Sequence, residues 1–174
     1  MAQVQVNNQI KRIIADLNVF PEQVQQASIF ALNRTAEWMK GRLAKDISDE
    51  QRLKLKLIRD RIVMQKANKR NPQTQLSCNF KSVYVKDLSN VTQTPIGVMA
   101  GGVMYPHAFI ATLKKGGKPG VYRRTTTKRF PVKSVTISIF DDASRRVEAL
   151  IGTEAQQVFE KRFLHEINRA TEAI

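Results

Sequence analysis

The sequence predicts an α+β fold in which one antiparallel sheet of about four strands packs against long N- and C-terminal helices. Apolar residues recur at helical spacing near both ends of the chain, whereas they alternate with polar residues between positions 74 and 140. A length of 174 residues with 42% hydrophobic content is typical of one globular domain, expected over residues 1–174. We divide it into a helical part at 6–67, a sheet with a basic arm at 74–140 and a C-terminal helical part at 142–174.

Two amphipathic patterns open the chain. Residues 6–17 predict a short helix, and Glu22 to Ile47 predict the longest helix of the protein. Pro21 suits the first turn of that helix, because its missing N–H costs no hydrogen bond there. The apolar arc of the long helix is wide, which indicates packing on two surfaces. Ser48 to Gln51 then has the pattern of a capping box and predicts a further helix over 49–67.

Alternation of apolar and polar residues predicts the strands. Residues 74–85 predict two short strands or one strand with a bulge. Residues 103–111 predict another strand, in which Pro106 indicates an edge position or a bulge. The alternation is most regular from Val135 to Ile139. Residues 88–102 are polar and contain proline and glycine, so we expect a surface loop or a mobile flap there.

The C-terminal part returns to helical spacing. Asp141 and Asp142 are expected to cap its first helix, and the pattern is interrupted near Gly152. The inward stripe of the last helix is predicted by residues at helical spacing, which are Phe159, Phe163, Ile167 and Ala170.

Cations gather in one stretch between the predicted strands, and we call residues 114–133 the basic arm. No acidic residue occurs between Asp87 and Asp141, and glycines near 116–120 give the arm reach. The whole chain carries a formal charge of +14, so we expect a nucleic acid or an acidic protein surface as partner. A solvated hairpin that only keeps the protein soluble is the alternative. The cations of the arm are Lys114, Lys115, Lys118, Arg123, Arg124, Lys128, Arg129 and Lys133.

No constellation for catalysis or metal binding assembles in the sequence. His107 and His165 are the two histidines, and Cys78 is the single cysteine, so neither metal spacing nor a disulfide framework is present. Cys78 fits a small core side chain. Residues 116–118 lack the spacing of a phosphate-binding loop. Apolar runs are too short to cross a bilayer and no signal peptide pattern is present. We expect no catalytic residue, cofactor, metal or membrane contact.

Several segments, in their order and spacing, resemble one family. They are Ala31 to Ala36, Ile58 to Ile62, Ala108 to Ala111, Gly120 to Arg124 and Arg129 to Lys133. The pattern resembles the minor tail protein Z family of tailed bacteriophages, and also the wider group of tail-completion proteins at the phage neck. The likeness covers the chain from about residue 20 to the last helix.

The resemblance implies a virion structural protein that caps the head-proximal end of the tail tube as an oligomeric ring, expected to be a hexamer, and enables head–tail joining. It implies contacts with further copies of the chain, with the tail terminator or tail tube, with head connector proteins, and with phage DNA in the lumen. The expected location is the neck region of the virion tail, and the host cytoplasm during assembly.

A head-to-tail ring needs two different surfaces on each subunit. The candidates for these surfaces lie on the long helix and on the predicted edge strand, and are Ile29, Trp38, Tyr105 and Phe109. Two other functions stay open. One is a stand-alone nucleic-acid-binding module that uses the basic arm, and the other is an enzyme such as a nuclease.

Overall fold

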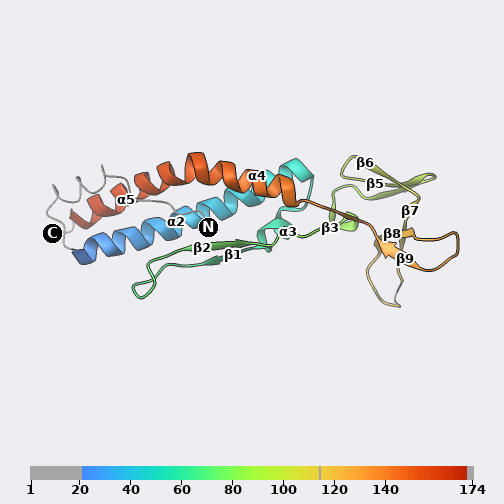
Figure 1. Ribbon diagram of the computed structural model, residues 1–174, viewed down its shortest axis with the longest axis horizontal. Coiled ribbons are helices and arrows are strands. Elements are labelled where there is room, and N and C mark those ends of the chain that lie inside the picture. The colour runs from blue at the N-terminus through green and yellow to red at the C-terminus, as the bar shows by residue number, and fades with distance from the viewer. Residues whose placement is uncertain (1–20, 114, 172–174) are drawn as a thin grey trace. The chain divides into compact units, whose positions relative to one another are not determined.

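The computed structural model describes residues 21–113 and 115–171, and it divides into two compact units (Figure 1). Unit 1 contains the described residues up to Leu43, residues 62–78 and the residues from Ser144 onward. Unit 2 contains residues 44–61 and 79–143. The expectation of one domain stays a prediction, and the helix expected at 6–17 lies outside the described residues.

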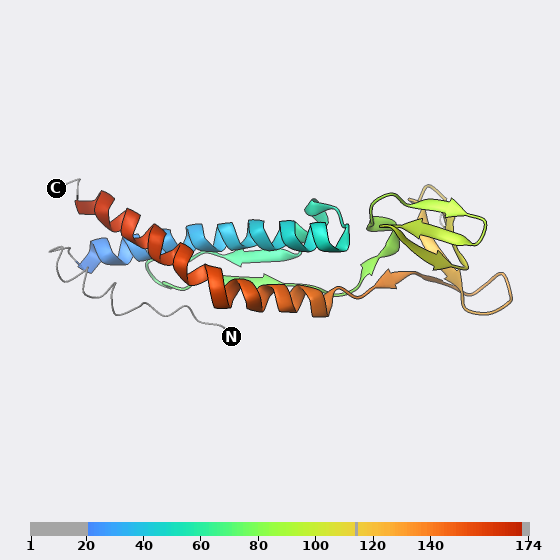
Figure 2. The ribbon, with the colours of Figure 1, turned by 90° about the horizontal axis from the view of Figure 1, so that it is seen from above.

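Two long helices form the core of unit 1. α2 (Pro21–Gln51) and α5 (Gln156–Thr171) lie side by side there and run in opposite directions, as both ribbon views show (Figures 1 and 2). The small side chains of Ala27 and Ala31 on α2 allow the bulky side chains of α5 to approach closely. The rings of Phe159 and Phe163 are one turn apart, with centroids separated by 5.9 Å. Phe159, Phe163 and Ile167 of the predicted inward stripe are buried, whereas Ala170 is half-buried.

An arginine ends α2 where the sequence predicts a new helix. Arg52 has a left-handed φ of 51°, and the Leu53 N–H donates to the Ser48 carbonyl at 3.0 Å. The Ser48 hydroxyl donates in turn to the Leu53 carbonyl at 2.6 Å. These contacts are those of a Schellman helix end, with arginine in the place that glycine usually occupies. Of the helix predicted over 49–67, only α3 (Leu55–Arg59) is present as a separate helix. The predicted start is wrong, because Ser48 helps to end a helix and does not begin one.

A β-hairpin completes unit 1. β1 (Ile62–Gln65) pairs antiparallel with β2 (Gln75–Cys78), and Asn33 of α2 holds the base of their connecting loop. The Asn33 Oδ1 accepts from the Ala67 N–H at 2.8 Å and from the Thr74 hydroxyl at 2.9 Å. The Asn33 Nδ2 donates to the Ala67 carbonyl at 3.0 Å. One amide side chain thus satisfies three polar groups of the loop.

The interruption predicted near Gly152 is a change of helix type. α4 (Phe140–Leu150) passes through a π-helical turn, Ile151–Ala155, directly into α5. The Thr153 hydroxyl donates to the Ala149 carbonyl at 2.7 Å in this turn.

Unit 2 consists of a short helix and small antiparallel groups of strands. The β4, β5 and β6 strands form one sheet, β7, β8 and β9 form another, and β3 pairs with β10. The bounds of the elements are α3 Leu55–Arg59, β3 Val83–Tyr84, a 3₁₀ turn at Val85–Asp87, β4 Thr92–Thr94, β5 Gly97–Ala100, β6 Val103–Pro106, β7 Ala108–Ala111, β8 Gly120–Arg124, β9 Val132–Ser134 and β10 Thr136–Ile137.

Backbone hydrogen bonds of Val135 connect two of these groups. The Val135 N–H donates to the Val121 carbonyl at 3.0 Å, and the Val135 carbonyl accepts from the Val85 N–H at 3.0 Å. The buried side chains of Val85, Val121 and Val98 contribute to the core of the unit. Segments far apart in the sequence are thereby joined through the backbone of Val135.

The segment predicted as a flap is folded. β4 and β5 lie within 88–102, and the turn between β5 and β6 is made by Gly101 and Gly102, with φ of 57° and 78°. Two consecutive positive φ angles favour a tight two-residue hairpin, which glycine adopts at little cost. The loop expectation for 88–102 is therefore wrong. Pro106 lies on β6, an edge strand of its sheet, as predicted.

The prediction of one antiparallel sheet of about four strands packed on long terminal helices is wrong. Within the described residues, ten short strands form four separate sheets of two or three strands. The reason is that turns and strained residues divide each alternating run. His107, for example, has a φ of 59° and separates β6 from β7 in the run predicted as a single strand.

Candidate binding surfaces

The described cations of the basic arm lie on two different loops of unit 2 and on the strands β8 and β9. Lys115 and Lys118 are exposed on the β7–β8 loop, residues 112–119. Lys128 and Arg129 are exposed on the β8–β9 loop, residues 125–131. Lys114 lies outside the described residues.

These loops lie at opposite ends of strand β8, because the β7–β8 loop precedes this strand and the β8–β9 loop follows it. The five residues of β8 span about 13 Å at a rise of roughly 3.3 Å per residue. Arg123 and Lys133 are partners across β8 and β9, close to the β8–β9 loop. We call the five cations at this end the basic cluster, which comprises Arg123, Arg124, Lys128, Arg129 and Lys133.

None of the seven described arm cations forms an ion pair with a described carboxylate. Two of them lie over aromatic rings instead: Arg124 is 5.8 Å from the Phe109 ring centroid, and Arg129 is 5.8 Å from that of Phe130. Such cation–π contacts orient a guanidinium without removing its charge. The basic cluster therefore presents uncompensated positive charge to solvent.

The β8–β9 loop is closed at its base and carries an exposed aromatic ring. The Thr125 N–H and hydroxyl both donate to the Pro131 carbonyl, at 3.2 and 3.1 Å. Phe130 lies between Arg129 and Pro131 in the sequence, and it is 59% exposed. The sequence indicates Phe130 only as an aromatic residue near charges, and its exposure depends on where the loop closes.

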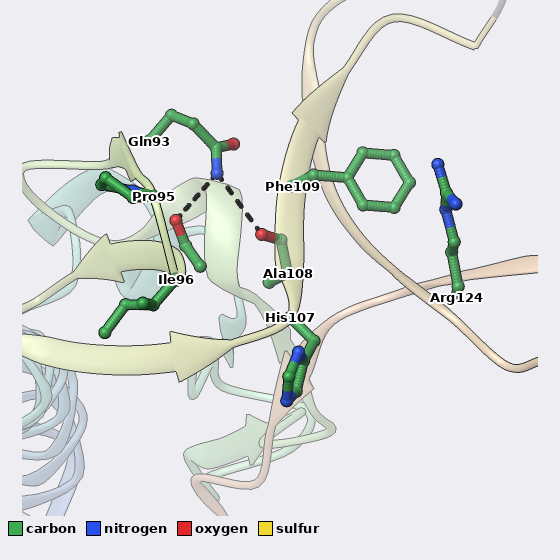
Figure 3. A pocket seen from close by; sticks show the side chains of 8 residues that line it. Gln93, Pro95, Ile96, His107, Ala108, Phe109 and Arg124 are labelled. Carbon is green, nitrogen blue, oxygen red and sulfur yellow. Dashed lines mark hydrogen bonds between the residues drawn. The ribbon is translucent and has the colours of Figure 1, made fainter. Parts of the chain in front are cut away.

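A second surface of unit 2 is an open groove of about 600 Å³ beside β7 (Figure 3). Pro95 and Ile96 form one side, whereas Phe109 and Arg124 form the other. Ile96 is 66% exposed, so much of its apolar side chain is available for contact. His107 is exposed on the same surface. The groove combines apolar walls with a cation.

Hydrogen bonds hold the two sides of this groove in place. The Gln93 Nε2 donates to the Gly97 carbonyl at 2.8 Å and reaches the Ala108 carbonyl at 3.5 Å (Figure 3). The Gln93 Oε1 accepts from the Ile110 N–H at 2.9 Å. The His107 N–H donates to the Ile96 carbonyl at 3.0 Å. The turn between β4 and β5 is thereby fixed to β7, and the groove exists before any partner binds.

The candidate subunit contacts are distributed over both units. Ile29 is 9% exposed and contributes to the core of the chain itself, while Trp38 is half-buried on α2. Tyr105 is half-buried on β6, where burial raises the pKa of its hydroxyl. Phe109 lines the groove. Their role as interface residues stays a prediction.

Other chemistry is limited in the described part of the chain. No group of three or more histidine, cysteine or acidic residues is placed to hold a metal ion there. His165 is exposed on α5, and Cys78 is a half-buried thiol whose pKa is raised by burial. No described helix is long and apolar enough to span a membrane.

Comparison with known proteins gives one family. Residues 9–172 match the family described as prophage minor tail protein Z (GPZ). Searches of curated proteins and of solved structures give no match.

Proposed function

Because the chain belongs to the prophage minor tail protein Z family, it is a structural component of a phage tail, and we propose that copies of it complete the tail. In this proposal the copies form a ring, expected to be a hexamer, at the head-proximal end of the tail tube. The ring contacts the tail terminator or tube on one side and the head connector on the other. It joins tail to head by docking, without catalytic turnover.

The observation that supports this proposal best is the uncompensated charge of the basic cluster. Its five cations, together with Lys115 and Lys118 at the other end of β8, are all exposed and have no carboxylate partner among the described residues, which is more than solubility requires. They would face either DNA that passes through the ring or an acidic surface of the neighbouring ring. Both partners attract such loops at long range.

The proposal is tested by removing the two exposed charges at the end of the β8–β9 loop. We expect Lys128→Gln with Arg129→Gln to leave the fold intact and to reduce the fraction of tails joined to heads, counted by electron microscopy. The matched control is Lys69→Gln with Arg70→Gln, which removes the same charges from the exposed β1–β2 loop of unit 1. Normal joining in both double variants would contradict the proposal.

A deletion of residues 114–120 tests the opposite end of β8. We expect this variant to fold and to lose head–tail joining, because the described residues removed are exposed loop residues except Gly120, the first residue of β8. Infectivity at the level of the unmodified phage would exclude a role for that loop.

A stand-alone nucleic-acid-binding module is the second candidate, and the same cations favour it. If the five cations of the basic cluster all contacted phosphates of a duplex, binding would weaken with log salt at a slope of roughly 4 to 5, about 0.9 per contact. Tight, length-dependent DNA binding by a monomer would support this module. A ring, or a complex formed only with tail tubes, would support tail completion.

A further inference from the structure

The groove of unit 2 is suited to an apolar side chain accompanied by negative charge. Its sides present Pro95, Ile96 and Phe109, and the Arg124 guanidinium lies at its edge over the Phe109 ring (Figure 3). No carboxylate of the described residues lines it. An incoming aromatic ring would bury apolar surface there, and an adjacent carboxylate would reach the cation.

The described part of the chain offers three exposed phenylalanines, and their neighbours distinguish them. Phe30 is 53% exposed, with Arg34 one helical turn further along α2. Phe130 is 59% exposed and follows the cation Arg129. Phe130 would bring positive charge to Arg124, which is unfavourable. The Arg34 charge beside Phe30 is already paired with Glu166, so neither ring is accompanied by a carboxylate that could reach Arg124.

Phe140 is different. It is 61% exposed at the start of α4, and Asp141, also exposed, follows it directly. It does not line the groove of its own chain. Phe140 and Asp141 therefore combine the apolar ring and the negative charge that the groove requires, and both are free of the chain's own core.

We propose that the groove binds the Phe140–Asp141 segment of a second copy of this chain, with the Phe140 ring between Ile96 and Phe109 and the Asp141 carboxylate beside Arg124. The inference rests on the proposed ring, because it assigns the two surfaces that each subunit contributes. The groove and the segment are different parts of one chain, so the contact is heterologous. The groove of each copy binds the segment of one neighbour, and the segment of the same copy binds the groove of the next. A ring results when the rotation between copies closes.

Disulfide trapping tests the contact without changing its charges. In a Cys78→Ser background, Ile96→Cys with Phe140→Cys is expected to give a ladder of cross-linked oligomers on oxidation, in free protein and in purified tails. An equal mixture of chains carrying only one of these cysteines is expected to give dimers, and each alone is expected to give none. Val103→Cys with Phe140→Cys is the matched control, since Val103 is 54% exposed and lies outside the groove.

A charge swap tests the pairing of Arg124 with Asp141. Arg124→Glu and Asp141→Arg are each expected to weaken self-association by about tenfold or more, and together to restore it to within about threefold. The control is Arg123→Glu with Asp141→Arg. Consecutive side chains of a strand point to opposite faces, so this pair is expected to show no restoration. Circular dichroism verifies that every variant is folded.

The outcomes separate this inference from the proposed function. If the unmodified protein forms rings, scored by sizing and electron microscopy, but the Ile96 and Phe140 cysteines give no ladder or the charge swap gives no rescue, the inference is wrong and the ring stands. If the unmodified protein is monomeric in solution and absent as a ring from tails, the proposed ring and this contact are both wrong.

Discussion

The two units of the chain use the same kinds of residue in opposite ways. In unit 1, Phe163 is buried, and the buried carboxylate of Glu166 is paired with Arg34. In unit 2, Phe130 is exposed and Arg129 has no carboxylate partner among the described residues. In these examples unit 1 satisfies a ring and a charge internally, whereas unit 2 leaves a ring and a charge available. We propose from this difference that unit 2 carries binding surfaces and that unit 1 contributes a stable support.

The sharpest test of this contrast is a pair of phenylalanine truncations. Phe163→Ala removes a ring that packs between α2 and α5, and we expect it to lower the free energy of unfolding by about 3–5 kcal/mol. Phe130→Ala removes an exposed ring, and we expect a change of about 0.5 kcal/mol or less. Denaturant unfolding followed by circular dichroism measures both. Similar losses in the two variants would contradict the assignment of Phe130 to a partner surface.

The same contrast explains which elements the sequence predicts. Helical spacing over several turns predicts α2 and the Phe159–Phe163–Ile167 stripe, because the buried residues of a helix repeat with its 3.6-residue period. The end of α2 was missed because Arg52 holds a left-handed position without being glycine. The sheets were missed because strands of two to five residues are too short for alternation to show which strands pair.

The second test concerns the ion pair of unit 1. Arg34→Ala leaves the Glu166 carboxylate, 6% exposed, without its cation, and we expect a loss of about 1–3 kcal/mol. The value is below that of a fully buried pair because the Arg34 side chain is 47% exposed. Arg129→Ala in unit 2 is expected to change unfolding little. In a Glu166→Gln background, Arg34→Ala should lower the free energy of unfolding by clearly less. An equal loss in that background would show that the charge of Glu166 is not the cause.

The candidate surfaces were predictable only in part. The cations of the basic arm are visible in the sequence, but their division between opposite ends of β8 depends on how β7, β8 and β9 pair. The groove was not predicted, because its walls come from residues 93–97, 107–109 and 124. No local motif connects these segments. Phe109 is predicted as an interface residue because it lies on a predicted edge strand. That prediction does not include the groove.

A third test compares two amide side chains that each hold a hairpin. Asn33 in unit 1 and Gln93 in unit 2 both donate and accept hydrogen bonds with backbone groups of neighbouring segments. We expect Asn33→Ala and Gln93→Ala each to lower the free energy of unfolding by about 1–2 kcal/mol. In hydrogen exchange, Gln93→Ala should lower the protection of the Ile110 amide, and Asn33→Ala should lower the protection of the Ala67 amide. If both variants lose protection throughout the chain, the units do not open independently.

The smallest expected effect concerns a surface ion pair of unit 1. Lys66 lies 2.8 Å from the Glu37 carboxylate, and its hydrogen bond and charge lower the pKa of that carboxyl. A lowered pKa in the folded state stabilises the protein above the ordinary pKa of glutamate, and this contribution is lost as the pH falls through the folded value. Lys66→Gln should therefore raise the Glu37 pKa toward its ordinary value in an NMR titration, with little change in stability at neutral pH because both side chains are exposed. Lys69→Gln removes an exposed charge of the same loop and should leave the titration of Glu37 unchanged. If Lys69→Gln raised the Glu37 pKa as much as Lys66→Gln does, the cause would be the overall positive charge of the loop and not the pair with Lys66.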